Sequence, residues 1–531
     1  MCHYLNKGER HVSEVIFMME AQCMKELEKT SSVCPACFKE GVISQIDAQI
    51  VEEDGKVYIV KKCDKHGEFK EIYFNDADLY HRWMKYRIDG EPYPEVKTHV
   101  YDEPALYDTH MSQTVLTNLL ITNRCDLRCS YCFMNAGASG VVYEPSLDEL
   151  REMMKKAREQ KPMGSKALQI TGGEPTIRED LMEIIDMGHE LGFSHMQLNT
   201  NGIKLADSVE YCKEIKKHGV NTVYLSFDGV SPDTNPWFEK NKQAIANLRE
   251  AKIHAVLVPC LIGGKNLHEA GKIIRFAIEN LDVVRGVNFQ PVSFCGRITK
   301  LKDEKRDAQR VDYVDMLAAI EDEFEGNISR DDFYPVPFVH PISRMMEFIS
   351  NRKEIEFTAH PGCGGATYVF FGDDGQIIPV TRFIDVEKMM EFIREQSEKK
   401  GALKKVRVGA AFWTHADEFI DETKAPKDFN LKQILKDAIL GGSYDSLRAF
   451  HYNSLFIGSM WFQDAFNLNV DRLQHCCIHY ATEEGIVPFC AYNGLGVGDK
   501  IREKYSLPIK EWEEQTGRKM KDDLRKDVPL S

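Results

Sequence analysis

The sequence predicts an α/β protein built on a partial (β/α)6 barrel of the TIM type, with a small metal-binding unit before it and a cysteine-containing region after it. Three observations support this. Short apolar runs alternate with amphipathic segments between residues 115 and 295, most cysteines fall in close groups, and one group has the spacing CxxxCxxC just after the first apolar run. Such alternation is typical of a parallel sheet covered by helices.

The barrel is expected to contain six strands, each followed by a loop and a helix. The first helix begins at Ser146, because Ser146 and Glu149 have the spacing of a capping box. Later helices are expected near residues 179–191, 205–218, 239–251 and 267–281. Six units are too few to close an eight-unit barrel, so we expect an open barrel with its active site at the carboxyl ends of the strands. The predicted strands are Val115–Thr122, Ala167–Thr171, His195–Asn199, Thr222–Ser226, Ala255–Leu261 and Gly286–Pro291.

The 531 residues are expected to form five segments. An N-terminal extension (1–30) precedes the small metal-binding unit (31–75), and a linker (76–114) leads into the barrel (115–295). A C-terminal region (296–531) follows, and we expect it to hold auxiliary metal sites and to bind substrate. Its longest apolar run, Leu455–Phe462, is expected to be a core helix.

The net charge indicates which kinds of partner the protein binds, and the N-terminal residues indicate its cellular compartment. The formal net charge is -15, which argues against nucleic acid and favours small molecules or lipids. The first residues lack the basic start and apolar core of a secretory signal, and no apolar run approaches the roughly 20 residues that cross a bilayer. We therefore expect a cytoplasmic protein with reduced thiols, in which 15 cysteines favour metal ligation over disulfides. Three isolated cysteines are expected to be packed or exposed thiols: Cys2, Cys23 and Cys212.

The CxxxCxxC motif after the first strand consists of Cys125, Cys129 and Cys132. Three thiolates can ligate three irons of a 4Fe-4S cube and leave the fourth iron without a protein ligand. The open iron can accept the amino and carboxylate groups of S-adenosylmethionine (SAM), whose reductive cleavage gives a 5'-deoxyadenosyl radical. The alternative is a structural zinc site, but zinc favours four ligands and no fourth lies close in sequence.

Polar or glycine-containing segments close the following strands. Gly172-Gly173-Glu174-Pro175 ends the second strand, where glycines let the backbone approach a ligand and Glu174 can accept a hydrogen bond from a cationic amine. Taken singly, the other strand ends would be ordinary turns. Their place in the series favours contact with the SAM carboxylate and ribose, or with adenine or substrate. These candidates are Asn199, Asn201, Ser226, Asp228, Asn288 and Gln290.

Two further groups of thiols indicate metal sites. A CxxC and a CxxH, 25 residues apart, provide four ligands for one zinc or iron ion, which serves either folding or electron transfer. Those ligands are Cys34, Cys37, Cys63 and His66. The C-terminal set suffices for one complete auxiliary cluster and part of another, with Cys260 as a further candidate; adjacent thiols in extended backbone could serve different sites. This set is Cys295, Cys363, Cys476, Cys477 and Cys490.

An aromatic residue at Tyr131 within the CxxxCxxC motif, followed by the GGEP motif, makes the chain resemble the radical SAM superfamily. Longer segments make it similar to the class D methyltransferase-like group, which includes archaeal tetraether lipid synthases. The resemblance implies a rubredoxin-like iron site, a SAM cluster and one or two auxiliary 4Fe-4S clusters. The segments that carry it are CPAC…CDKHG, CDLRCSYC, FYPVPF, EFTAHPGCGGATYVF, PVTRFIDVE and CCIHYATEEGIVPFCAYN.

The same resemblance implies a reaction that couples the terminal carbons of isoprenoid ether-lipid chains. It also implies a ferredoxin or flavodoxin as electron donor, peripheral contact with the membrane, and a tunnel for the lipid chain, for which Leu455–Phe462 is a candidate lining. An alternative in the same group is methyl transfer to a pterin precursor of the 7,8-dihydro-6-hydroxymethylpterin type. A long apolar tunnel favours lipid, and a compact polar pocket with a carboxylate favours pterin. A non-catalytic iron-sulfur carrier would not need the strand-end residues.

Overall fold

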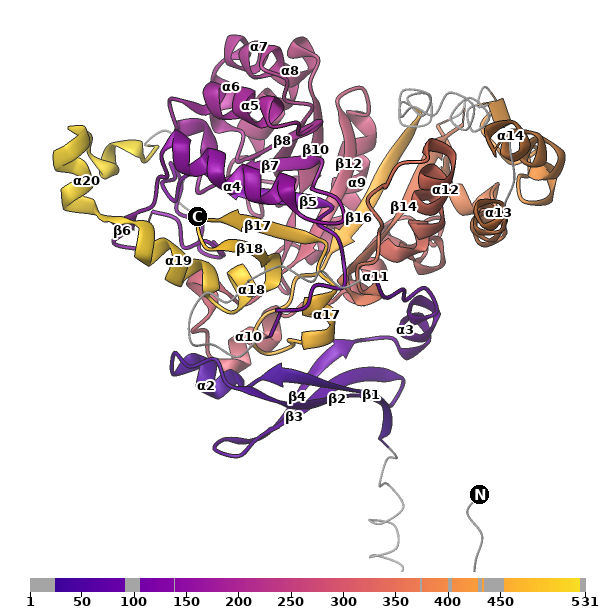
Figure 1. The fold of residues 1–531 in the computed structure, drawn as a ribbon, viewed down its shortest axis with the longest axis horizontal. Coiled ribbons are helices and arrows are strands. Elements are labelled where there is room, and N and C mark those ends of the chain that lie inside the picture. Colours follow the sequence, from indigo (N-terminus) through magenta and orange to yellow (C-terminus); the bar gives the residue numbers. More distant parts are fainter. Residues whose placement is uncertain are drawn as a thin grey trace, which may run out of the picture.

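The computed structural model describes residues 24–90, 106–137, 139–372, 375–399, 404–427, 432–433 and 453–525. Cys2, Cys23 and the rest of residues 1–23 of the predicted N-terminal extension, and residues 91–105 of the predicted linker, lie outside this part. Figure 1 shows a four-stranded sheet beneath a large α/β body, with a group of helices to one side. No disulfide joins the cysteines that the structure describes.

The N-terminal unit is an antiparallel sheet in the order β1-β2-β3-β4. Its first strand starts at Lys25, six residues before the predicted start of the unit, and pairs with β2. Asp54 and Gly55 have φ values of 53° and 71°, the positive values that a type I′ hairpin turn requires, and they join β2 to β3. The elements are β1 (Lys25–Val33), α2 (Pro35–Lys39), β2 (Gln45–Glu53), β3 (Lys56–Cys63), β4 (Gly67–Phe74) and α3 (Ala77–Met84).

All six predicted barrel strands are present, adjacent and parallel. They are β5 (Leu116–Leu120), β7 (Ala167–Thr171), β8 (His195–Thr200), β9 (Thr222–Ser226), β10 (His254–Val258) and β12 (Val284–Pro291). The helices on the outer face of this sheet are α4 (Leu147–Glu159), α5 (Leu181–Glu190), α6 (Ile203–Asp207), α7 (Val209–Lys217), α8 (Phe238–Ala251) and α9 (Ala270–Glu279).

Helix starts follow the local capping chemistry. The predicted capping box of α4 is present: Ser146 Oγ accepts from the Glu149 N–H at 3.3 Å, and Glu149 Oε2 accepts from the Ser146 N–H at 2.7 Å. The helix expected over 205–218 is two helices. Ser208 is extended, with φ of -151°, and its side chain caps α7, which separates α6 from α7.

Two strands from the C-terminal region extend the barrel on both edges. β16 (Ser454–Met460) is parallel to β12, and β17 (Ile478–Thr482) is parallel to β5. Eight parallel strands therefore run consecutively from β16 to β17, although the sheet stays open between these two. The expectation of a core helix at Leu455–Phe462 is wrong, because most of this run is β16. Alternate residues of an extended strand can pack on both covered faces of a parallel sheet.

The rest of the C-terminal region covers the edges of the barrel. Antiparallel strands β14 (Gly364–Phe371) and β18 (Gly485–Pro488) follow β16 and β17 at the two edges, and one group of helices lies to the side. Among the described helices, none is long and apolar enough to cross a membrane. The main helices of this region are α10 (Asp303–Gln309), α11 (Tyr313–Glu323), α12 (His340–Ser350), α13 (Val386–Glu398), α14 (Lys404–His415), α17 (Val470–Gln474), α18 (Phe489–Gly494), α19 (Val497–Tyr505) and α20 (Ile509–Thr516).

The N-terminal sheet packs on the segment that connects β16 to β17. Ser32 Oγ donates to the Leu468 carbonyl at 2.6 Å, and the buried Lys61 donates to the Ala465 carbonyl at 3.0 Å. Thr30 Oγ1 donates to Asn469 Oδ1 at 2.7 Å. The N-terminal unit is thus bonded directly to the segment that leads to Cys476 and Cys477.

Candidate active site and metal centres

A cavity of about 230 Å³ lies inside the barrel, where the strand ends meet the CxxxCxxC loop. All three cysteines of that loop line it. Most of the predicted SAM-binding residues line it too, although they come from five different segments of the chain. Those are Tyr131, Gly172, Gly173, Asn199, Asn201, Ser226, Asp228, Asn288 and Gln290.

The three thiols of this loop share one wall of the cavity, and their ligation of a 4Fe-4S cube stays a prediction. Cys125 Sγ accepts a hydrogen bond from the Leu127 N–H at 3.4 Å. Burial raises the pKa of Cys125 well above its ordinary value, and Asp126 adds to the effect. Metal binding at this thiol therefore releases a proton.

Arg297, which the sequence did not single out, holds the CxxxCxxC loop in place. Its guanidinium donates to the Cys129 carbonyl at 2.6 Å and to Asn135 Oδ1 at 3.2 Å, and it also bonds the Ala136 carbonyl. The backbone N–H of Arg297 donates to the Cys132 carbonyl at 3.1 Å. A single side chain thus binds both ends of the loop segment that carries two of the three thiols.

Replacing Arg297 by glutamine is expected to loosen this loop and to lower both the iron content of the reconstituted protein and its rate of SAM cleavage. Hydrogen bonds that involve a charged group contribute about 1.5–3 kcal/mol each, so losing one or two corresponds to a fall of about tenfold or more. Iron per chain and 5'-deoxyadenosine formation measure the effect. Lys300→Gln removes an exposed charge three residues away and should change neither. Full iron content and rate in Arg297→Gln would contradict this role.

The GGEP segment packs directly against the CxxxCxxC loop. The Gly173 N–H donates to the Thr122 carbonyl and the Glu174 N–H to the Arg124 carbonyl, both at 2.8 Å. A Cβ at Gly173 would lie 2.1 Å from the Arg124 carbonyl oxygen, so the close approach that requires glycine here is to the protein's own backbone. Pro175 begins a short 3-10 helix and, like Glu174, does not line the cavity.

The Glu174 carboxylate is buried among protein donors. Oε1 accepts from the Thr176 and Thr200 hydroxyls at 2.6 and 2.7 Å, and Oε2 accepts from the Asn201 N–H at 2.8 Å. Burial, together with the nearby Asp126, raises the pKa of Glu174 to about 7. In these contacts Glu174 joins the ends of β7 and β8, and binding of the SAM amine by this carboxylate stays a prediction.

Tyr131 and Asp228 connect the CxxxCxxC loop to the end of β9. The Tyr131 hydroxyl donates to Asp228, whose other oxygen accepts from the Cys260 N–H at 2.8 Å. Burial raises the pKa of Asp228 above its ordinary value. Lys265 lies 4.8 Å from the centre of the Tyr131 ring. The cavity therefore has a carboxylate in its wall, fixed by two donors.

Further polar residues of the cavity were missed by the sequence reasoning. Asn118, Gln169 and Tyr224 lie deeper in the barrel, on β5, β7 and β9, and line the same cavity. For Asn118 and Gln169, the sequence feature that could have identified them is a single amide in the middle of a mainly apolar strand, LTNLL and ALQIT respectively. The side chain of Gln169 donates to Gln197 Oε1 at 3.3 Å, which continues the row of amides onto β8.

One wall of the cavity is aromatic. The rings of Phe462 and Phe489 are stacked, with centroids 3.8 Å apart and planes at 24°. Tyr480 stacks on Phe489 at 5.5 Å and 29°. All three residues line the cavity and come from the C-terminal region. The lining thus combines aromatic and aliphatic side chains with the polar strand ends, and the role of the C-terminal region in binding substrate stays a prediction.

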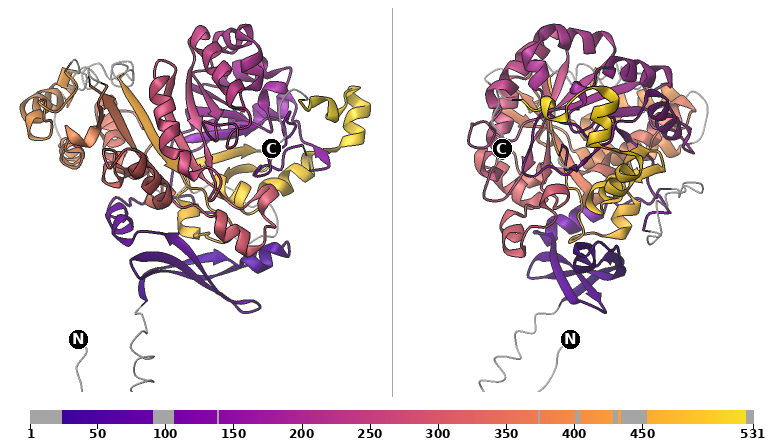
Figure 2. Two further views of the ribbon diagram at one scale, coloured as in Figure 1. Left: turned by 180° about the vertical axis from the view of Figure 1, so that it is seen from behind. Right: turned by 90° about the vertical axis from the view of Figure 1, so that its left-hand side faces the viewer.

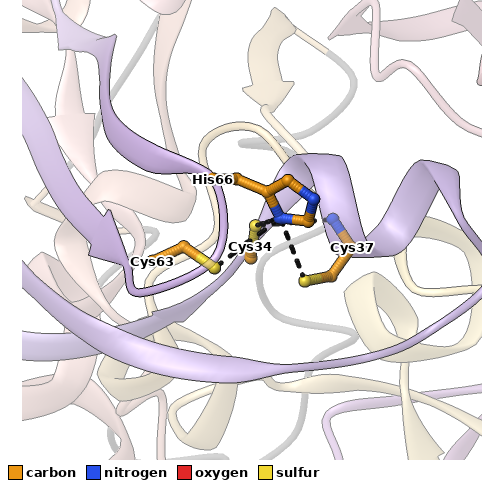
Figure 3. A group of neighbouring side chains, drawn as sticks. All are labelled: Cys34, Cys37, Cys63 and His66. Carbon is orange, nitrogen blue, oxygen red and sulfur yellow. Dashed lines mark hydrogen bonds between the residues drawn. The ribbon is translucent and has the colours of Figure 1, made fainter.

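The predicted N-terminal metal ligands lie together. His66 Nδ1 is 3.5, 3.4 and 3.7 Å from the sulfurs of Cys34, Cys37 and Cys63 (Figure 3). The four ligand atoms lie within 4.8 Å of one another, as tetrahedral coordination of one ion requires. His66 Nε2 is 3.4 Å from Glu40 Oε1, a carboxylate contact that orients metal-binding imidazoles. The set fits a single ion with four protein ligands.

The C-terminal cysteines divide into two groups. Cys476 and Cys477 form one group with Cys363 and Cys490. Burial raises the pKa of both Cys476 and Cys477, and the nearby charges of Cys363 and Cys490 raise it further. Cys295 instead lines the central cavity, as does Cys260. Cys490 also reaches that cavity, and its sulfur accepts from the Gln463 N–H at 3.3 Å. Four thiols are the ligand number of a complete 4Fe-4S cluster.

A parallel barrel with a CxxxCxxC loop after one strand and a GGEP loop after the next defines a radical SAM enzyme, and the model of the radical SAM superfamily matches residues 119–277. A model described as the HMPTM N-terminal zinc ribbon domain matches residues 26–75. The 7,8-dihydro-6-hydroxymethylpterin dimethyltransferase of Methanocaldococcus jannaschii is 42% identical over 503 residues, which cover 91% of this chain and 97% of that protein. The chain belongs to the family of that dimethyltransferase.

Other similarities are confined to part of the chain. A probable GTP 3',8-cyclase of Archaeoglobus fulgidus is 33% identical over 171 residues, 30% of this chain and 55% of that protein. The crystal structure of methylornithine synthase covers 40% of this chain and 64% of its own, with 12% identity and a TM-score of 0.31. The predicted radical SAM superfamily is confirmed. The comparisons favour the pterin alternative over the tetraether lipid synthase, and the N-terminal unit is a zinc ribbon domain.

Proposed function

We propose that this radical SAM enzyme is a methyltransferase that acts on a pterin of the 7,8-dihydro-6-hydroxymethylpterin type. The observation that carries the proposal is the compact cavity beside the three cluster thiols, where amides and the Asp228 carboxylate interrupt a lining of aromatic and aliphatic side chains. An isoprenoid chain would leave the Nδ2 donor of Asn118 without an acceptor, which is costly in a buried site. A pterin ring offers donors and acceptors to the amides and the carboxylate. The 42% identity to a pterin dimethyltransferase over nearly its whole length agrees with this choice.

The residues of the cavity would bind the cluster, orient SAM and exclude water. Cys125, Cys129 and Cys132 would hold the 4Fe-4S cluster, which together with SAM supplies the electron and the 5'-deoxyadenosyl radical when bound. Polar side chains at the ends of β8 and β9 would orient SAM. The barrel wall would keep water away from the reacting groups, which prevents quenching of a reactive intermediate. A ferredoxin or flavodoxin is our proposed electron donor.

We assign the remaining metal sites from their ligand sets. The ribbon ligands would bind one zinc ion, and the group of Cys363, Cys476, Cys477 and Cys490 would bind one auxiliary 4Fe-4S cluster. Arg472 supports the second assignment. It is fully buried beside these thiols; burial lowers its pKa, but the charges of Cys363, Tyr73 and Cys490 outweigh this and raise the pKa. A buried cation beside thiolates stabilises the negative charge that a cluster with four thiolate ligands carries.

The proposal is tested with the anaerobically reconstituted full chain, a chemical reductant, SAM and 7,8-dihydro-6-hydroxymethylpterin. The expected result is 5'-deoxyadenosine together with pterin that has gained one or two methyl groups, measured by mass spectrometry. A methyl donor other than SAM is tested by adding isotope-labelled SAM and following the label. Formation of 5'-deoxyadenosine with unchanged pterin and consumption of an archaeal ether lipid would overturn the proposal in favour of lipid coupling.

A further inference from the structure

Two amide side chains of the cavity, those of Asn118 and Gln463, each have a buried amide nitrogen without a hydrogen-bond partner among the residues that the structure describes. Asn118, in the middle of β5, is 1% exposed, and its Nδ2 is a buried donor without an acceptor. Its side chain lines the central cavity. Burying an amide donor without a partner destabilises a fold, so a group retained in this state is a candidate for binding a ligand.

The neighbours of Asn118 in the sheet define what kind of ligand fits. Strand register places Asn118 beside Gln169 of β7 on one side and beside Tyr480 of β17 on the other. Residues in register on parallel strands point to the same face, and all three line the cavity. Asn118 is therefore flanked by an amide and by a ring of the aromatic wall.

The aromatic wall and the row of amides complement different parts of one planar molecule. Phe462, Phe489 and Tyr480 stack on one another, and Tyr492 stacks on Tyr480 at 3.9 Å and 18°, so these rings form an apolar wall against which a flat heterocycle can pack. Its edge would then face the amides. Gln169 already uses one donor on Gln197, whereas Asn118 has Nδ2 available for an acceptor. A 2-amino-4-oxo pterin carries acceptors on its pyrimidine edge and is flat enough to stack.

Resting on the proposed function, we propose that Asn118 is a specificity-determining residue that donates a hydrogen bond from Nδ2 to an acceptor on the pyrimidine edge of the pterin, while the ring packs against the aromatic wall. The contact recognises the substrate and takes no part in binding the cluster. Removing it weakens pterin binding and leaves the iron content and SAM binding unchanged.

The test compares wild type with Asn118→Leu, which keeps the volume and removes the donor. The anaerobically reconstituted full chain is titrated with 7,8-dihydro-6-hydroxymethylpterin and, separately, with SAM by calorimetry, and iron per chain is counted. We expect pterin affinity to fall about tenfold, the effect of one lost hydrogen bond in a dry site. Thr117→Val is the matched control. Thr117 is the preceding residue, is equally buried, also has an unpartnered hydroxyl and does not line the cavity.

The outcomes separate this inference from the proposed function. If wild type binds SAM but no pterin, the proposed function is overturned and the role of Asn118 falls with it. If wild type and Asn118→Leu bind pterin equally, only the inference is overturned. Should Asn118→Leu lose iron, Asn118→Ala replaces it, because it removes the same donor without added branching. Equal pterin affinity in that variant would also overturn the inference.

Discussion

Replacing Cys129 by alanine is expected to abolish SAM cleavage. Cys129 is one of three thiols of the CxxxCxxC loop that line the central cavity, and a cube held by two thiolates cannot keep a defined open iron for SAM. We expect 5'-deoxyadenosine formation to fall at least about 1000-fold, equivalent to about 4 kcal/mol. The iron and sulfide of one cluster should be lost as well. Iron counting, electron paramagnetic resonance of the reduced protein and product chromatography measure these effects.

The control for Cys129 is Cys212→Ala. Cys212 is fully buried on α7, away from the cavity, and its sulfur donates only to the Leu205 carbonyl. This variant should keep its iron and its rate, with a modest loss of stability from the smaller side chain. Retained SAM cleavage in Cys129→Ala would exclude a cluster at this loop as the source of the radical.

The second large effect is expected from Cys63→Ser in the zinc ribbon. The four ligands lie within 4.8 Å of one another, and a structural zinc ion contributes on the order of 10 kcal/mol of folding free energy to a small domain. Losing one ligand is expected to reduce bound zinc by about one ion per chain and to unfold the ribbon. Elemental analysis and limited proteolysis within residues 24–75 measure both effects.

Unfolding of the ribbon in Cys63→Ser should also destabilise the rest of the chain. Ser32 and Lys61 bind carbonyls of the segment between β16 and β17, so loss of the ribbon frees that segment and should lower the thermal midpoint of the whole chain. The control is Lys62→Ala, an exposed neighbour of Cys63 on the same strand. An unchanged midpoint in Cys63→Ser would contradict the structural role, and iron in place of zinc would contradict the metal assignment.

The sequence was most informative where structure depends on residues close together in the chain. The six β/α units, the capping box at Ser146 and the CxxxCxxC loop follow from apolar periodicity and short spacings, and the structure has them where they were predicted. The ribbon ligands were also predictable, because four metal ligands at fixed spacing have few other uses. The substrate was the weaker prediction. Motifs shared within a group of enzymes report their common chemistry and do not report the shape of the cavity.

By itself, the sequence determined the radical SAM core and its thiol loop, since strand period, turn residues and ligand spacing are local properties. Only the tertiary structure decided that β16 and β17 join the barrel, which brings Tyr480 beside Asn118 across more than 300 residues of chain. The same packing gathered Cys363, Cys476, Cys477 and Cys490, and it set Arg297 against the cluster loop. These contacts depend on strand register and burial between distant segments, which no local pattern encodes.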